Sequence, residues 1–202
     1  LEAKQPKFFL AENVSGMLIS KHTEALEGIK ELFRNAGIGY ELSFQMLNAS
    51  DYNVPQDRKR VFFIGIRKDL NFKYQFPTET FPKITLESAI SDLKEGVLPA
   101  LEYNNTNGEN CVLPNHEYMI GSFSSIFMSR NRVRSWDEQS YTIQAGGRHA
   151  PIHPQAPKMK FIEQNIRVFV PGKEHLYRRL SVRECARIQT FPNDFITTNL
   201  YS

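Results

Sequence analysis

Val61-Phe-Phe-Ile-Gly-Ile66 is a continuous apolar run, and it is typical of a strand buried inside an α/β sheet. Upstream, Phe8-Phe-Leu-Ala-Glu-Asn-Val14 begins with a shorter run of the same kind, which predicts a second buried strand. Between the two, residues 18–36 carry apolar side chains at helical spacing, and residues 40–46 alternate apolar and polar side chains like a half-buried strand. This β-α-β-β order predicts one half of an open α/β sheet, with the other half missing.

Length and composition set limits on the kind of protein. The chain has 202 residues, of which 41% are hydrophobic and 23% charged, so it can form one large domain or two small ones. No apolar run approaches the roughly 20 residues that span a bilayer, and no signal-like segment opens the chain. Cys111 and Cys185 give no framework for disulfides or zinc, so we expect a reducing compartment and no metal. The start at Leu1 suggests a fragment.

The composition and the periodicity of the sequence change from about residue 77. Thr85 is a candidate cap for a short helix over 86–93, and the stretch that follows is rich in Asn, Gly and Pro without a long period. Ser181-Val-Arg-Glu184 is a capping box, which predicts a helix that Pro192 closes. We therefore expect three segments, with boundaries at 1–80, 81–175 and 176–202.

Three arginines, Arg130, Arg132 and Arg134, occupy every second position of residues 129–136. In an extended segment this spacing points all three guanidinium groups the same way. A planar fork that binds two acceptors at once is what reading guanine in the major groove requires. With Gly147-Arg148 downstream, the segment predicts a DNA-reading loop, and the alternative is a scatter of surface arginines. The net charge of +3 is mild, so a nucleic-acid face depends on such local clusters.

Two further segments suggest chemistry. Glu12 closes an apolar strand, at the edge where α/β sheets place ligands, and partial desolvation there would let its carboxyl hold a proton near neutrality. Arg58 and Arg60 precede the Val61 strand, and if they continue it they share one face and can bind a phosphate or a base carbonyl together. A loop carboxylate and ordinary flanking basic residues are the alternatives. Four more arginines border the last helix, where an ordinary exposed face is an equal alternative: Arg178, Arg179, Arg183 and Arg187.

Taken together, the segments Ala11-Glu-Asn-Val14, Gln56-x-Arg-x-Arg60 and 179–192 follow the order of motifs in DNA cytosine-5 methyltransferases, which the chain resembles over nearly its whole length. The intervening segment is similar to the target recognition domain of HaeIII-type enzymes, which modify the inner cytosine of GGCC. Four stretches carry that resemblance: Asn115-His-Glu-Tyr118, Phe127-Met-Ser-Arg-Asn-Arg-Val-Arg134, Gly147-Arg148 and His153-Pro-Gln-Ala-Pro157.

The resemblance implies a fold and a place for each segment. The fold is α/β, a partial S-adenosylmethionine-dependent methyltransferase (Rossmann-like) sheet with a small, loop-rich mixed target recognition domain. Residues 1–80 are then the distal part of the catalytic domain, 81–175 the target recognition domain, and 176–202 a helix and junction that return to the catalytic domain. The implied system is bacterial restriction and modification, in the cytoplasm.

The resemblance also implies roles. Such enzymes flip the target cytosine out of duplex DNA, and a cysteine thiolate attacks carbon 6 so that carbon 5 can take a methyl group from S-adenosylmethionine. By resemblance Glu12 protonates or hydrogen-bonds the ring nitrogen and exocyclic amine, and Arg60 holds the ring carbonyl. Arg58 supports the site, and Asn13 positions the loop that carries the nucleophile. The implied DNA-binding residues are Arg130, Arg132, Arg134, Arg148 and Arg179.

Two parts of the family's machinery are not found in the sequence. Neither Cys111 nor Cys185 follows a proline, as the family's nucleophile does, and Gly37-Ile-Gly39 enters a strand instead of opening a helix as a cofactor-binding turn does. We therefore expect the chain alone to be inactive and to need a missing amino-terminal half or a complementing subunit. Three possibilities stay open: a fragment of a GGCC-type methyltransferase, a natural subunit of a split enzyme, and a non-catalytic DNA-binding module.

Overall fold

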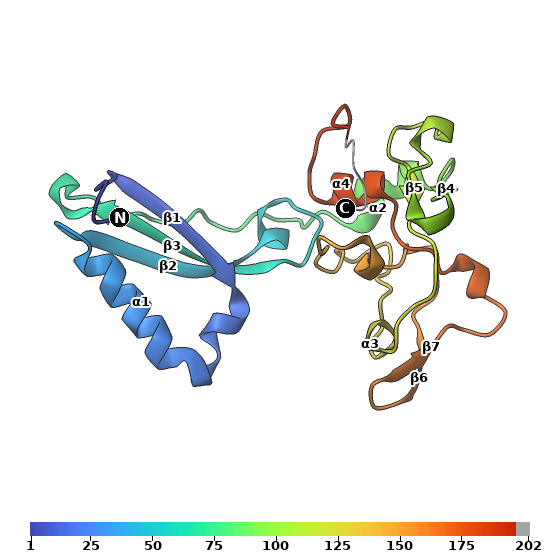
Figure 1. Ribbon diagram of the computed structural model, residues 1–202, viewed down its shortest axis with the longest axis horizontal. Helices are drawn as coiled ribbons and strands as arrows, with labels where there is room; N and C mark the ends of the chain where they lie inside the picture. The colour runs from blue at the N-terminus through green and yellow to red at the C-terminus, as the bar shows by residue number, and fades with distance from the viewer. Residues whose placement is uncertain (197–202) are drawn as a thin grey trace. The chain divides into compact units, whose positions relative to one another are not determined.

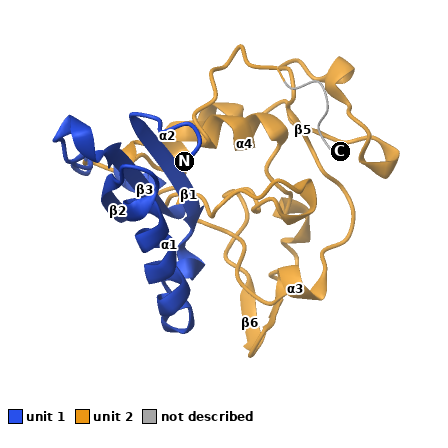
Figure 2. Cartoon of the chain, turned by 60° about the vertical axis from the view of Figure 1, so that its left-hand side comes forward, with its two compact units in different colours: residues 1–51, 58–80 blue, residues 52–57, 81–202 orange. Residues whose placement is uncertain are grey.

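The computed structural model describes residues 1–196, which form two compact units (Figure 2). Unit 1 comprises Leu1–Asp51 and Arg58–Thr80, and unit 2 comprises Tyr52–Asp57 and the chain from Phe81 onward. Residues 197–202, the end of the third expected segment, lie outside the described residues.

Unit 1 is built on a three-stranded sheet in which β3 (Lys59–Arg67) lies between β1 (Phe8–Val14) and β2 (Tyr40–Asn48) (Figure 1). Both outer strands pair antiparallel to β3, so β1 and β2 run in the same direction. The helix between them, α1 (Thr23–Asn35), makes the crossover connection. The predicted α/β class is confirmed.

One face of this sheet carries the core of unit 1. Leu26 of α1 packs with Val61 and Phe63, and all three are buried. The central position of β3 therefore confirms the prediction that residues 61–66 form a buried strand. Gly65 makes room for the ring of Phe9, which lies directly opposite on β1, because a Cβ atom at position 65 would overlap that ring.

The prediction that the Phe8 run is buried is wrong. Phe8 and Leu10 are 69% and 60% exposed. β1 pairs with β3 only, so it is an edge strand, and its alternate residues point away from α1. The two side chains that point toward α1, Phe9 and Ala11, are partly buried.

Unit 2 is dominated by loops, as expected. Its helices are α2 (Leu86–Ile90), α3 (Ser125–Met128) and α4 (Val182–Ile188). Two small sheets pair β4 (Leu98–Pro99) with β5 (Glu117–Tyr118) and β6 (Lys160–Glu163) with β7 (Ile166–Val168) (Figure 1). One apolar cluster packs α2 against α4 through Ile90 and Ile188, and another surrounds Phe127 and Ile152.

The predicted helix caps of unit 2 are confirmed. The Thr85 side chain accepts a hydrogen bond from the N–H of Ser88, and Ser181 and Glu184 form both halves of the capping box. The final helix ends at Ile188, before the predicted stop at Pro192. In the part of the chain that the structure describes, no helix has the length and apolar character needed to cross a membrane.

Candidate functional site

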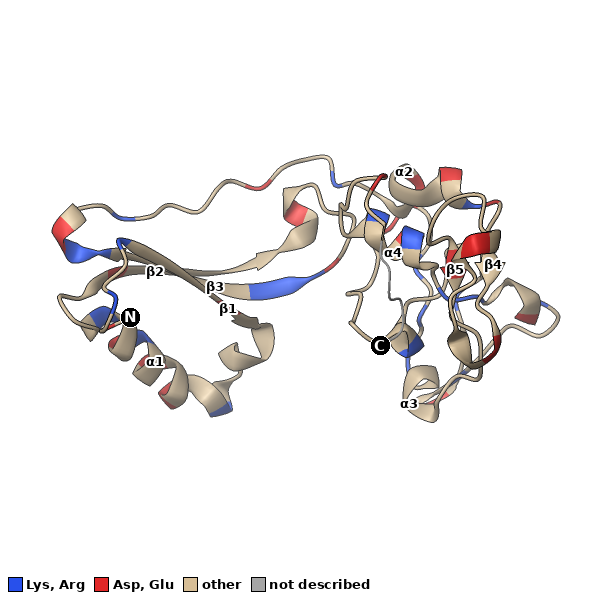
Figure 3. Ribbon diagram, turned by 45° about the horizontal axis from the view of Figure 1, so that its top comes forward, with Lys and Arg blue, Asp and Glu red and all other residues tan. Residues whose placement is uncertain are grey.

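Glu12 and Arg60 form an ion pair on the face of the sheet opposite α1. The Oε1 atom of Glu12 lies 2.6 Å from Nε of Arg60, and their side chains are 42% and 19% exposed. The strand register explains the pair, because Glu12 lies opposite Phe62 and Arg60 opposite Val14. The side chains of Glu12, Phe62 and Arg60 therefore point to one face. Figure 3 shows the basic start of β3 in blue.

This pair corrects one expectation about Glu12. Its surroundings are not apolar: the carboxyl is paired with a guanidinium and is partly open to solvent. Arg60 also donates a hydrogen bond from Nη1 to the carbonyl oxygen of Lys59, at 2.8 Å. The two side chains hold each other in place and leave the second carboxylate oxygen of Glu12 available to a ligand.

The neighbouring predicted residues occupy defined positions. The main chain of Arg58 continues the pairing of β2 with β3, since its N–H donates to Oδ1 of Asn48 and its carbonyl accepts from the N–H of Ala49. Asn13 alternates with Glu12 along β1 and so points to the α1 face, where its Oδ1 accepts from the N–H of Val14 at 2.8 Å.

The three arginines of residues 129–136 differ in their surroundings. Val133 makes an isolated parallel β-bridge to Ile152, and residues 129–136 form no strand. Arg132 donates to the carbonyl oxygens of Ile126 and Phe127 and lies over the Phe127 ring.

Arg134 and Arg130 differ most in their ion pairing and exposure. Arg134 forms ion pairs of 2.9 Å with both Asp57 and Glu138, and Asp57 was not predicted to have this role. Arg130, in contrast, is exposed. Among the three, Arg130 is the one most accessible to a ligand.

Arg179 is buried beneath a polar pocket. Arg179 is 3% exposed. An exposed helical face was one alternative for it and for Arg178 and Arg183, but all three residues are buried. The guanidinium of Arg179 donates to the carbonyl oxygens of Arg148, Met119, Gly121 and Ser122 and lies 4.1 Å from the centre of the Phe123 ring.

The pocket above Arg179 has a volume of about 290 Å³. Eight residues line it: Asn104, Met119, Ile120, Gly121, Ser122, Ser124, Arg148 and Arg179. The side chain of Arg148 is exposed at its rim. Sequence reasoning identified the two arginines but missed Asn104 and Ser122, because no motif marks them and a long loop brings them here.

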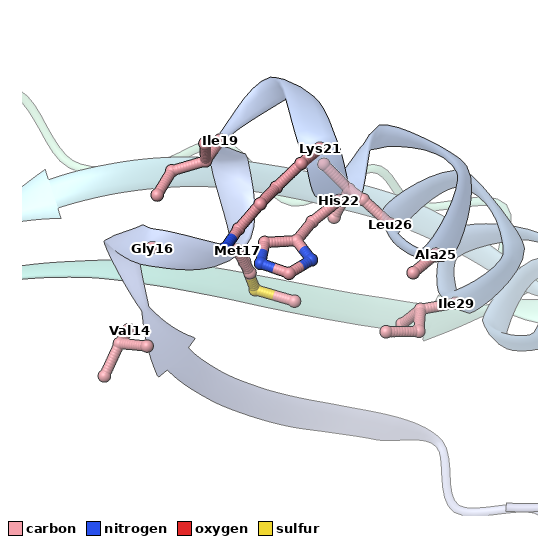
Figure 4. Close-up of a pocket in the computed structure, with 9 residues that line it drawn as sticks. All are labelled: Val14, Gly16, Met17, Ile19, Lys21, His22, Ala25, Leu26 and Ile29. Atoms are coloured by element: carbon pink, nitrogen blue, oxygen red, sulfur yellow. The ribbon is translucent and has the colours of Figure 1, made fainter.

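A second pocket, of about 420 Å³, lies between the end of β1 and the start of α1 (Figure 4). Its lining is mainly apolar and contains no carboxylate. The lining residues are Val14, Gly16, Met17, Ile19, Lys21, His22, Ala25, Leu26 and Ile29. Gly37 and Gly39 join α1 to β2, as expected, and so do not open a helix. This lining therefore offers no carboxylate to accept hydrogen bonds from the ribose hydroxyls of S-adenosylmethionine.

The two thiols are poorly suited to act as nucleophiles. Burial raises the pKa of Cys185 to about 12. Burial and then the nearby Glu117 carboxylate raise the pKa of Cys111, whose Sγ lies 3.7 Å from Oε2 of Glu117. Because the thiolate is the reactive form, both are protonated and inert near neutral pH.

Comparison with known proteins gives consistent matches. The family model described as "C-5 cytosine-specific DNA methylase" matches residues 1–200. The type II methyltransferase M.MthTI of Methanothermobacter thermautotrophicus is 57% identical over 196 residues, and M.FnuDI of Fusobacterium nucleatum is 53% identical over 194. These alignments cover 97% and 95% of this chain but 58% and 56% of the relatives, so the chain spans less than two thirds of their length.

Solved structures support the fold. A crystal structure of a DNA modification methyltransferase encoded within a prophage (E. coli) aligns with a TM-score of 0.60 at 20% identity, covering 94% of this chain and 60% of the other. The Dnmt2 methyltransferase of S. pombe aligns with a TM-score of 0.51 at 17% identity, covering 96% of this chain and 57% of the other.

Proposed function

The chain belongs to the C-5 cytosine-specific DNA methylase family, and from that premise we propose that it holds the target cytosine and reads the DNA sequence in a type II modification methyltransferase. The observation that carries the proposal is the Glu12–Arg60 pair. It joins a carboxyl and a guanidinium that the two strands present on one face of the sheet. A flipped cytosine offers a ring nitrogen and a ring carbonyl that match these two groups.

The chemistry of the pair follows from where charge develops. When a thiolate adds to carbon 6 of cytosine, the carbon 5–carbon 6 double bond opens and negative charge is delocalised toward the ring nitrogen and carbonyl. Glu12 can protonate or hydrogen-bond the ring nitrogen and exocyclic amine, and Arg60 can donate a hydrogen bond to the carbonyl oxygen. Arg58 and Asn13 support this site, Asn13 from the α1 side of β1.

The nucleophile and the methyl donor come from outside the described residues in this proposal. Cys111 and Cys185 are protonated near neutral pH, and the apolar pocket beside β1 offers no carboxylate to the ribose hydroxyls of S-adenosylmethionine, the proposed methyl donor. The open edge of β1 and the exposed side chains of Phe8 and Leu10 supply a surface for the missing part. In the first candidate that part belongs to the same polypeptide. In the second candidate this chain is a natural subunit of a split enzyme, and that part is a separate subunit.

Unit 2 is the proposed DNA reader, and its proposed target is GGCC in duplex DNA. Arg130 and Arg148 have exposed side chains and are the direct base readers in this proposal. Arg132, Arg134 and Arg179 are held by contacts within unit 2 and shape the reading surface. A bidentate contact of one arginine to guanine contributes about 1–3 kcal/mol of discrimination.

Competition binding tests the proposal. The full chain is titrated with a GGCC duplex against a base-permuted duplex of equal length, at one fixed near-physiological salt because phosphate contacts dominate raw affinity. We expect a preference of about tenfold or more, which corresponds to about 1.4 kcal/mol. Arg148→Ala should lose most of that preference, whereas Lys173→Ala, at an exposed loop position of unit 2, should keep it. Equal binding of the two duplexes by the unaltered chain would reject the GGCC assignment.

A further inference from the structure

We propose that the pocket above Arg179 binds one backbone phosphate of the DNA duplex and that Asn104 and Ser122 position it. The inference rests on the proposed function, because it takes DNA to be the substrate. It goes beyond that function by assigning a binding site to loop residues that belong to none of the motifs.

The charge of the pocket favours an anion. Two arginines line it and, among its lining residues, there is no carboxylate. The guanidinium of Arg179 is fixed by four carbonyl oxygens and by the Phe123 ring, so its charge cannot move away from the pocket. Shielding from water strengthens the field of such a charge. Arg179 therefore acts through its field, and other groups must supply the hydrogen bonds.

Donors are available around the pocket. Oδ1 of Asn104 accepts from the N–H of Ile120 at 2.8 Å, while Nδ2 donates no hydrogen bond to any described residue. The hydroxyl of Ser122 is likewise without a partner in the described chain. The carbonyls of Gly121 and Ser122 point to Arg179, and their N–H groups donate to no other described residue.

This set of groups matches a phosphate better than a nucleobase. The Asn104 amide nitrogen and the two main-chain N–H groups can only donate, the Ser122 hydroxyl can donate, and a phosphodiester presents acceptors only. A base edge usually presents donors as well as acceptors, and these would need acceptors in the pocket. The exposed Arg148 at the rim can then reach a base while the pocket fixes the register of the strand.

Asn104→Asp is the sharpest test. Asn104 has a φ of 59°, a left-handed conformation that Asp also tolerates, and the new carboxylate can still accept from the N–H of Ile120. The substitution replaces the Nδ2 donor by a negative charge inside the pocket. Asn105→Asp is the matched control, because it adds the same charge at an exposed position outside the lining and also removes an amide donor, the one that Asn105 gives to the carbonyl oxygen of Glu102.

We expect Asn104→Asp to weaken duplex binding about tenfold, equally for GGCC and permuted duplexes, and to reduce the salt slope by about one. Asn105→Asp should stay within about twofold of the unaltered chain. Ser122→Asp gives the same test if Asn104→Asp does not fold. A loss confined to the GGCC duplex would show that the pocket reads a base, and equal losses from both Asn variants would show only general repulsion. Either result, or no loss, overturns the proposal.

A second measurement separates this proposal from the proposed function. Inorganic phosphate is titrated into the full chain while NMR follows the side-chain amide of Asn104 and the main-chain amide of Ser122. Saturable shifts that Asn104→Asp abolishes would support the pocket even if the chain bound no duplex, and the DNA role alone would then fail. Duplex binding that Asn104→Asp leaves unchanged would reject the pocket and keep the function. Absence of both phosphate shifts and duplex binding would reject both.

Discussion

The carboxylate of Glu12 lies 2.6 Å from the guanidinium of Arg60, although the two residues come from opposite ends of the β-α-β-β segment. The antiparallel register of β1 and β3 brings them together diagonally across the sheet. The pair therefore depends on strand pairing, and a register change of one residue would move Glu12 to the α1 face.

Glu12→Gln should separate catalysis from stability. The pair is partly exposed, so its loss should change the free energy of unfolding by less than about 1 kcal/mol. In the complete enzyme the same change should lower kcat by about 10²- to 10⁴-fold if Glu12 has the proposed role at the ring nitrogen, because the amide of Gln cannot supply a proton. Glu41→Gln, an exposed position on β2, is the control and should retain activity. Urea unfolding and a methyl-transfer assay give the two readouts. Full activity of Glu12→Gln would remove the proposed role.

Gly65→Ala should destabilise unit 1 by about 1–3 kcal/mol, because the new Cβ overlaps the Phe9 ring across the strand pair. Gly28→Ala is the matched control. Gly28 lies inside α1 with no heavy atom within 4 Å of a Cβ placed there, so alanine should stabilise the helix by about 0.5–1 kcal/mol. Urea unfolding followed by far-UV circular dichroism measures the free energy of unfolding of both variants. Changes of the same sign in the two variants would contradict the packing described.

Unit 2 should lose stability as the pH falls from 6.5 to 4. His153 is fully buried, and burial lowers its pKa to about 4, against the opposing effect of the Glu184 carboxylate. Between these pH values the unfolded chain binds a proton that the folded chain does not. The contribution of neutral His153 to the free energy of unfolding is therefore fully present above pH 6.5, and about 3 kcal/mol of it is lost by pH 4.

Trp136 reports this loss, because its ring lies 5.2 Å from that of His153 and it is the chain's one tryptophan. Urea unfolding followed by its fluorescence should show a falling midpoint between pH 7 and 5. His153→Asn should show a much flatter dependence over this interval. The same slope in both proteins would assign the effect to other groups.

Both cysteines should resist alkylation in the folded chain at pH 7.5, since a pKa raised to about 12 for Cys185 and a raised pKa for Cys111 leave little thiolate. Mass spectrometry after iodoacetamide treatment should find slow labelling in buffer and labelling of both thiols in urea. Rapid labelling of one native thiol would identify an activated cysteine and reopen its role as a nucleophile.

Local features of the fold could be read from the sequence. The Thr85 cap and the Ser181–Glu184 capping box depend on residues three positions apart, so their pattern is complete within one turn of helix. The apolar period that predicts α1 and the run that predicts β3 likewise follow from short-range spacing. The family was indicated by something else, the resemblance of three motifs in order to those of known methyltransferases: Ala11–Val14, Gln56–Arg60 and 179–192.

Tertiary structure alone decided which of these residues meet. Strand patterns do not record their partners, so the exposed edge of β1 and the contact of Glu12 with Arg60 required the register. A list of arginines does not say which are buried: Arg179 lies beneath a pocket and Arg134 is paired with Asp57 across a long loop. The physical reason is that side-chain burial and ion pairing are set by distant segments packing together, whereas propensity and capping act within a few residues.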